Sequence, residues 1–312
     1  MNSFYLAFSV VFPLFVYMVI GGIVKKLKLY SYESFRSLNG LIFKLLIPLT
    51  LFIDVYKADI GDAFQPGVFA FVFFSTLITW AACWVFFSKT IDDIPDQATM
   101  IQGVYRSNFV LFGTTIAAAL CDDAGVALVA ALCAMTVPMF NILSVITFEV
   151  KRGGSAKPSQ LIISIFRNPL VDAALIALIF HLLPFRLPDL LLSPLSKLAS
   201  CASPMALVTL GGMLSFGSMV QHRKYLVQAV LGRLIIVPLI VLALAILLGF
   251  RGNALVAILS IFASPTAVAS GPMAQAMGGN GPLAGEIVAL TSVICILTIF
   301  LIVFELSSIG MI

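Results

Sequence analysis

The segment that decides the fold reads Ser-Pro-Thr-Ala-Val-Ala-Ser-Gly-Pro at residues 264–272 and lies inside an otherwise apolar stretch. Each proline removes a backbone donor and pushes against the carbonyl one turn earlier, so a helix cannot pass through this segment undisturbed. Within a bilayer, backbone groups freed in this way persist only where protein buries them or a wet cavity receives them. The sequence therefore predicts a broken helix whose unwound middle offers amides and carbonyls to a polar partner.

A second interrupted segment lies in the other half of the chain. Residues 102–115 read Gln-Gly-Val-Tyr-Arg-Ser-Asn-Phe-Val-Leu-Phe-Gly-Thr-Thr. Paired interruptions at corresponding positions of two halves indicate a transporter's binding site near the bilayer midplane. We therefore expect the two segments to form one site.

The composition indicates an all-α polytopic membrane protein. Of 312 residues, 61% are hydrophobic and 10% are charged, against about 25% charged in soluble domains. Apolar runs of about 20 residues recur, and each is long enough to cross a bilayer as a helix. The net charge of +4 reflects basic loops, so we expect the lipid bilayer, and no nucleic acid, as a partner.

The chain offers little for metal, redox or enzyme chemistry. The five cysteines never form a Cys-x-x-Cys pair, and His181 and His222 each stand alone. We expect no metal site, no disulfide and no cofactor. The sequence lacks a phosphate-binding G-x-x-x-x-G-K-[ST] loop and the common hydrolase motifs, so we expect a protein that is not an enzyme.

Ten spans can be drawn, and they fall into two sets of five. They cover roughly residues 4–24, 38–54, 65–87, 98–119, 124–148, 166–183, 191–216, 225–249, 253–275 and 283–306. A polar linker at 150–165 separates an N-terminal repeat, 1–149, from a C-terminal repeat, 166–312. Because each half has an odd number of spans, the two halves would have opposite orientations. We therefore expect two inverted five-helix repeats with broken crossover helices 4 and 9.

Basic residues predict the orientation. Lys and Arg concentrate in the connections after the first, third, fifth and seventh spans. Connections rich in Lys and Arg stay in the cytoplasm. We expect a multi-pass protein of the cell membrane with both termini outside and the central loop cytoplasmic.

Several short motifs along the chain resemble the auxin efflux carrier family, which includes bacterial malate and malonate permeases. The motifs occur in the family's order, and together they cover most of the chain. They are Leu38–Phe43 with Ile47-Pro48-Leu49, Gln102-Gly103 with Arg106–Phe109 and Gly113, Asn141–Val145, Arg167–Leu170, Ala202–Gly212, and Ser264–Val268.

The resemblance implies a fold, a mechanism and one contact residue. It implies ten helices in two inverted repeats, substrate anions held where spans 4 and 9 cross, alternating access, and a homodimer. In the plant members an asparagine of the fourth-span break contacts the substrate carboxylate, and Asn108 occupies that position. Ser107 replaces the proline that precedes this asparagine in plant carriers, which argues against auxin itself as the substrate.

Physical chemistry supports the same candidates. The Asn108 amide can donate two hydrogen bonds to a carboxylate, and helix N-termini favour anions. The expected substrate-binding residues are Asn108, Arg106, Ser107, Thr266, Ala267 and Ser270, and the expected crossover backbone positions are Gly113, Pro265, Gly271 and Pro272.

Structural alternatives remain open for each of these residues. Asn108 could bond a neighbouring helix, and the hydroxyls of Thr266 and Ser270 could repair a proline kink. Arg106 could attract an anion or extend toward the surface, whereas for Arg233 we favour a structural partner or such an extension. Glu286 either suits a helix N-terminus or couples transport to an ion.

The favoured function is secondary transport of a small organic anion, such as malate or malonate. Coupling to H⁺ or Na⁺ is left open. An anion channel and a non-transporting membrane sensor are the alternatives.

Overall fold

The computed structural model describes the whole chain except residues 1, 58–62, 154–162, 164–167, 183–186 and 215. Within the described residues the protein is all-helical, and no strand forms. Six helical stretches there are long and apolar enough to cross a membrane. They are Tyr32–Lys57, Pro66–Thr90, Asp123–Gly153, Asp189–Met213, Arg223–Leu247 and Gly281–Ser308. The chain is therefore a multi-pass membrane protein, as its composition predicts.

The elements before the central connection follow the order of the predicted spans. They are α1 (Asn2–Lys26), α2 (Tyr32–Leu41), η1 (Ile42–Leu46), α3 (Ile47–Lys57), α4 (Pro66–Thr90), α5 (Ile94–Tyr105), α6 (Phe109–Leu120) and α7 (Asp123–Gly153). Helix α7 continues into the segment predicted as a linker. The rest of that linker lies largely outside the described residues, as does Arg167.

The elements after the central connection are mostly shorter. They are α9 (Pro169–Leu182), α10 (Asp189–Ser200), α11 (Ala202–Met213), α12 (Phe216–Gln221), α13 (Arg223–Leu231), η3 (Gly232–Ile236), α14 (Val237–Leu247), α15 (Gly252–Phe262), α16 (Ser270–Ala276) and α17 (Gly281–Ser308).

Two wide helical turns, η1 and η3, each end two residues before a proline. η1 precedes Pro48 and η3 precedes Pro238, and in both the residue before the proline bonds back five residues. A proline has no N–H and its ring crowds the carbonyl four residues earlier. A π-turn relieves this conflict by shifting the hydrogen-bond register, so the apolar segment continues as one helix with a local bulge.

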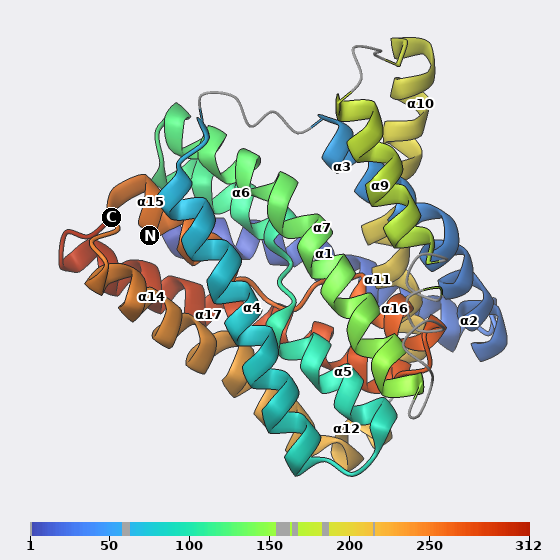
Figure 1. Cartoon of the computed structure of the whole chain (residues 1–312). Coiled ribbons are helices and arrows are strands. Elements are labelled where there is room, and N and C mark those ends of the chain that lie inside the picture. Colours follow the sequence, from blue (N-terminus) through green and yellow to red (C-terminus); the bar gives the residue numbers. More distant parts are fainter. Residues whose placement is uncertain (1, 58–62, 154–162, 164–167, 183–186, 215) are drawn as a thin grey trace.

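The two predicted breaks form and meet in the middle of the molecule (Figure 1). The first separates α5 from α6, and the second separates α15 from α16. Ser107 and Thr266 make an antiparallel backbone bridge. Around it the Asn108 N–H donates to the Pro265 carbonyl at 2.8 Å, and the Ala267 N–H donates to the Arg106 carbonyl at 3.3 Å. Each unwound segment thus satisfies part of the other's backbone.

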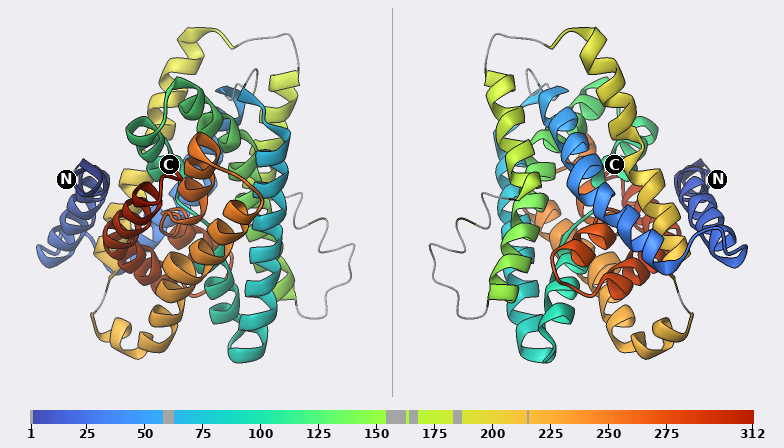
Figure 2. Two further views of the ribbon diagram at one scale, coloured as in Figure 1. Left: turned by 90° about the vertical axis from the view of Figure 1, so that its left-hand side faces the viewer. Right: turned by 90° about the vertical axis from the view of Figure 1, so that its right-hand side faces the viewer.

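Helix α1 lies at the edge of the molecule and packs against α11 (Figure 2). A Cβ atom on Gly211 would lie only 1.9 Å from the Met18 carbonyl oxygen, and one on Gly21 only 1.9 Å from the Val208 carbonyl oxygen. Small residues let helix backbones approach this closely in membranes. These glycines therefore fix how near α1 sits to α11.

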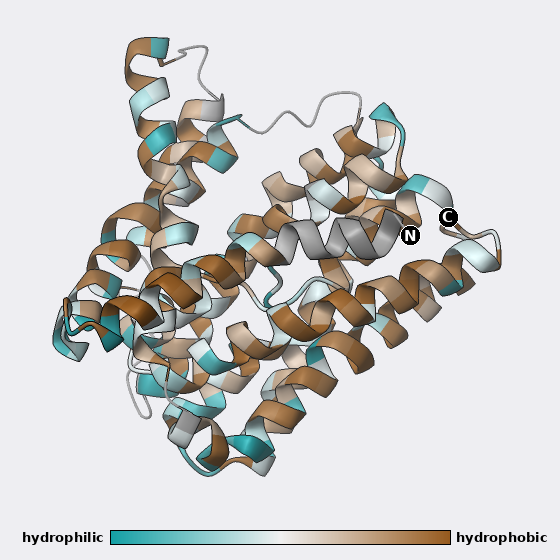
Figure 3. Ribbon diagram, turned by 180° about the vertical axis from the view of Figure 1, so that it is seen from behind, coloured by the Kyte–Doolittle hydropathy of each residue, from teal (hydrophilic) through white to brown (hydrophobic). Residues whose placement is uncertain are grey.

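Hydrophobic residues cover the lengths of the helices, and hydrophilic ones gather toward the helix ends and loops (Figure 3). At one end the Asn253 amide donates to Asp122, and the Gly252 N–H donates to the Met311 carbonyl. At the other end the Lys151 ammonium donates to Ser88 and Gln97. This pattern suits an apolar middle between two polar layers.

Candidate functional site

A cavity of about 640 Å³ lies beside the crossing of the two broken segments. Four of the expected substrate-binding residues line it: Arg106, Ser107, Asn108 and Ala267. Helices α1, α3, α6, α7, α10 and α11 supply most of the remaining wall. Its polar or charged lining residues are Tyr17, Thr50, Asp54, Arg106, Ser107, Asn108, Thr115, Asn141, Ser200 and Ser203.

Asn108 lines the cavity from the N-cap position of α6, and its side chain makes no capping hydrogen bond. Its backbone is held by the Pro265 carbonyl, and its side chain is only 8% exposed. The side-chain Nδ2 makes no hydrogen bond to any residue that the structure describes, and neither does the Ser107 hydroxyl. An unsatisfied buried donor is costly. A ligand oxygen in the cavity would satisfy this amide.

Arg106 is the positive charge at the cavity wall. Its Nη2 donates to the Asn141 side-chain oxygen at 2.8 Å, and Nη1 lies 2.9 Å from the Met273 sulfur. With the Gln102 amide oriented to satisfy its neighbours, its oxygen also accepts from Nη1 at 3.1 Å. Over the described part of the chain, no carboxylate forms an ion pair with this guanidinium. Arg106 is thus oriented by neutral groups, and its charge is left for an anion.

The N-terminus of α6 adds to the positive electrostatic potential at the cavity wall. Helix α6 begins directly after Asn108, and its first residues Val110 and Leu111 also line the cavity. A helix N-terminus carries partial positive charge from its aligned backbone dipoles. The cavity therefore combines a guanidinium, an amide donor and a helix N-terminus, which together suit a carboxylate.

Thr266 and Ser270 do not line this cavity. The Thr266 hydroxyl donates to the Gly103 carbonyl at 2.6 Å, and its N–H donates to the Thr291 hydroxyl. Ser270 is 1% exposed, and its hydroxyl has no partner among the described residues. In this conformation Thr266 ties the two broken helices together.

The four backbone positions lie in and around the breaks. Pro265 supplies the carbonyl that holds Asn108. Gly271 and Pro272 are buried in the first turn of α16. Gly113 lies in α6, where a Cβ atom would meet the Phe109 ring at 2.4 Å.

Sequence reasoning did not name seven of the ten polar or charged wall residues as binding residues, and Asp54 and Asn141 are the two that bear most on the chemistry of the site. Asp54 follows Thr50 by four residues on α3, so both side chains lie on one helix face, and both line the cavity. That spacing after Pro48 was a usable signal. Asn141 was noted only as part of a family motif, and its contact with Arg106 depends on how α7 packs against the first break.

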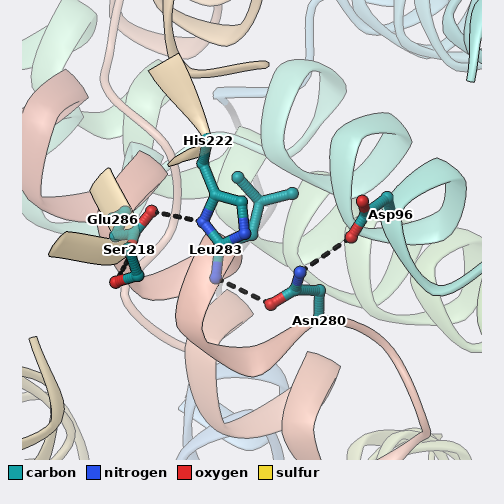
Figure 4. Close-up of polar contacts among 6 residues, drawn as sticks. All are labelled: Asp96, Ser218, His222, Asn280, Leu283 and Glu286. Carbon is teal, nitrogen blue, oxygen red and sulfur yellow. Dashed lines mark hydrogen bonds and ion pairs between the residues drawn. The ribbon is translucent and has the colours of Figure 1, made fainter. Parts of the chain in front are cut away.

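A separate polar cluster lies at the start of α17 (Figure 4). The Glu286 carboxylate is 1% exposed, accepts from the Ser218 hydroxyl, and lies 2.8 Å from His222 Nδ1. Nearby, Asn280 caps α17 through the Leu283 N–H and donates to Asp96 at 2.7 Å. Glu286 thus joins α17 to the chain around α12, outside the main cavity.

The fold and the site define a class: a helical membrane protein with two broken helices that pair beside a polar cavity. A family model described as "Membrane transport protein" matches residues 6–303, and the chain belongs to this family, the auxin efflux carriers. A search of curated proteins found no match.

Proposed function

We propose that the protein is a secondary transporter of small organic anions, such as malate or malonate, that binds its substrate at the crossing of the two broken helices. One observation carries this proposal. The unpaired Asn108 amide and the Arg106 guanidinium, which lacks a carboxylate partner in the described structure, line the same cavity. A carboxylate would meet charge-assisted hydrogen bonds there.

The mechanism we propose is alternating access around this site. The order of elements supports an inverted repeat of five plus five spans. In each half an apolar helix is followed by a proline-bearing segment, a long span, a broken helix and a long final helix. Such repeats move against each other around a fixed midplane site in many transporters. Arg106, Ser107, Asn108 and Ala267 would contact the substrate, whereas Thr266 and Ser270 would do so only after a rearrangement of the crossing.

Three further assignments rest on the sequence pattern and the family. The distribution of Lys and Arg favours the cell membrane, with both termini outside and the central loop cytoplasmic. Family resemblance favours a homodimer. The driving force is the substrate gradient, the membrane potential, or a coupled H⁺ or Na⁺.

Uptake by purified protein in liposomes tests the proposal. The panel is malate, malonate, lactate, pyruvate and indole-3-acetate, and the variants are Asn108→Ala and Asn253→Ala. Asn253 is a matched control because it bonds Asp122 at one end of the molecule, away from the cavity. Saturable uptake that is impaired in Asn108→Ala and retained in Asn253→Ala is the expected result.

The same assay separates the alternative functions. A channel would give flux that does not saturate and no exchange of internal for external substrate. A sensor would bind an anion without flux. Equal saturable uptake by Asn108→Ala and the wild-type protein would contradict the assigned site.

A further inference from the structure

A second buried arginine, Arg233, contacts the crossing of the two broken helices but does not line the cavity. It belongs to η3 and is 0% exposed. Its guanidinium donates only to backbone carbonyls in the contacts described. The acceptors are Ser264 at 2.7 Å, Ile261 at 2.8 Å, and Val104 and Tyr105 at 3.2 Å each.

These carbonyls belong to both broken helices at the points where they end. Val104 and Tyr105 are the last residues of α5, while Ile261 and Ser264 flank the end of α15. The last carbonyls of a helix have no partner within it, and they carry the negative end of the helix dipole. Arg233 therefore compensates two helix C-termini at once.

No carboxylate forms an ion pair with Arg233 within the described ranges. Among the contacts of the described residues, the guanidinium meets carbonyl oxygens. Carbonyls of unwound segments and half-helix C-termini are the groups with which broken-helix transporters coordinate Na⁺. The ligand set around Arg233 is thus that of a monovalent cation site.

We infer that the Arg233 guanidinium is a tethered cation that occupies a carbonyl site for a monovalent ion and holds the two half-helices together without sodium. Arg233 is a positioning residue, because its guanidinium holds the carbonyls of Tyr105 and Ser264. Tyr105 directly precedes Arg106 and Ser264 directly precedes Pro265, and these two segments form the backbone bridge. Removing the guanidinium leaves a vacant site that accepts Na⁺ or a free guanidinium ion.

The positions of the acceptor carbonyls suit a guanidinium, because Nε, Nη1 and Nη2 of Arg233 each donate to a different carbonyl. Five N–H donors in a fixed planar fork can serve several carbonyls at once, whereas a lysine ammonium is a compact point charge with three donors. Gly232 also lets η3 approach α5, since a Cβ there would lie 3.1 Å from a Val104 methyl carbon.

The test is thermal unfolding of the wild-type protein, Arg233→Ala and Arg233→Lys, each in sodium, choline or millimolar guanidinium chloride at equal ionic strength. Arg251→Ala is the matched control. Arg251 also donates to carbonyls at a helix end, those of Ile246 and Phe250, but it is exposed. For the wild-type protein, and likewise for Arg251→Ala, the unfolding temperature should not differ between the three salts.

Arg233→Ala should unfold about 5–10 °C lower in choline, and sodium or guanidinium should recover at least half of that loss. A folded Arg233→Ala protein with unchanged stability, or with a loss that neither ion recovers, would overturn the inference. If Arg233→Ala does not fold, the wild-type protein and Arg233→Lys decide. A sodium-specific stabilisation of the wild-type protein would overturn the inference, whereas indifference to sodium together with a folded but weakened Arg233→Lys would support it.

The inference concerns the transport site proposed above, but its unfolding readout does not depend on transport. Absence of uptake by the wild-type protein with these unfolding results would count against the proposed function alone. Uptake by the wild-type protein that requires sodium would overturn the inference and leave the proposed function standing.

Discussion

Arg106 and Asn108 stand two residues apart, yet they contribute differently to the cavity. Arg106 supplies charge and is held by Asn141, whereas Asn108 supplies an amide donor without a partner in the described structure. Their roles can be separated by substituting each residue singly.

Arg106→Gln should raise the KM for anion uptake about tenfold to a hundredfold, because a hydrogen bond to a charged group contributes about 1.5–3 kcal/mol. Glutamine removes the positive charge but is shorter than arginine and loses the bond from Nη2 to Asn141, so thermal unfolding of the variant is measured alongside. The check is the concentration dependence of uptake at equal amounts of folded protein. An unchanged KM would show that Arg106 does not contact the substrate.

Asp54→Asn should lower the KM about two- to tenfold near neutral pH. Asp54 lines the same cavity, so its ionised carboxylate would repel a bound anion, and asparagine removes that charge with little change in shape. Uptake kinetics measure the effect, with Thr50→Ala as a control for the same face of α3. Loss of accumulation in Asp54→Asn would contradict a purely repulsive role and assign the carboxylate to proton coupling.

Thr266→Val should lower the free energy of unfolding by about 1–3 kcal/mol, because the Gly103 carbonyl loses the donor at 2.6 Å. The KM should change little, since Thr266 does not line the cavity. Thr266→Ser keeps the hydroxyl and serves as the control. A raised KM at normal stability would instead place Thr266 in the substrate site.

At the scale of elements, the close packing of α1 against α11 can be tested by substituting its glycines. Gly211→Ala should destabilise the protein by about 1–3 kcal/mol, because the added methyl group would collide with the Met18 backbone. Gly22→Ala, whose nearest neighbour lies at 3.9 Å, should be nearly neutral. Thermal unfolding in detergent compares the two, and equal stability would contradict the close packing of α1 on α11.

Some of the helix breaks and bulges could be predicted from the sequence, and others could not. Prolines and polar residues within apolar runs predicted both breaks, and the structure confirms them at Arg106–Asn108 and Ala263–Ala269. The bulges η1 and η3 were not predicted, because a proline leaves several local hydrogen-bond arrangements open. The contrast between Arg106 at the cavity and Arg233 behind it depends on helices far apart in the chain, so sequence spacing could not separate them.

The central connection and the C-terminal end of α17 should lie on opposite sides of the membrane. After replacement of the five native cysteines, a cysteine at Ser308 should react with a membrane-impermeant reagent from outside intact cells. A cysteine at Arg152, the exposed residue near the end of α7, should react only after the membrane is opened. Labelling of both positions from the same side would contradict an odd number of spans between them.

The central claim is that the crossing of the two broken helices is an anion site. Equilibrium binding of the transported anion to protein in nanodiscs tests it most directly, because binding does not depend on coupling or on the transport cycle. We expect Asn108→Ala and Arg106→Gln each to weaken the Kd about tenfold or more, with Asn253→Ala unchanged. Wild-type affinity in both cavity variants, with all proteins folded, would contradict the claim.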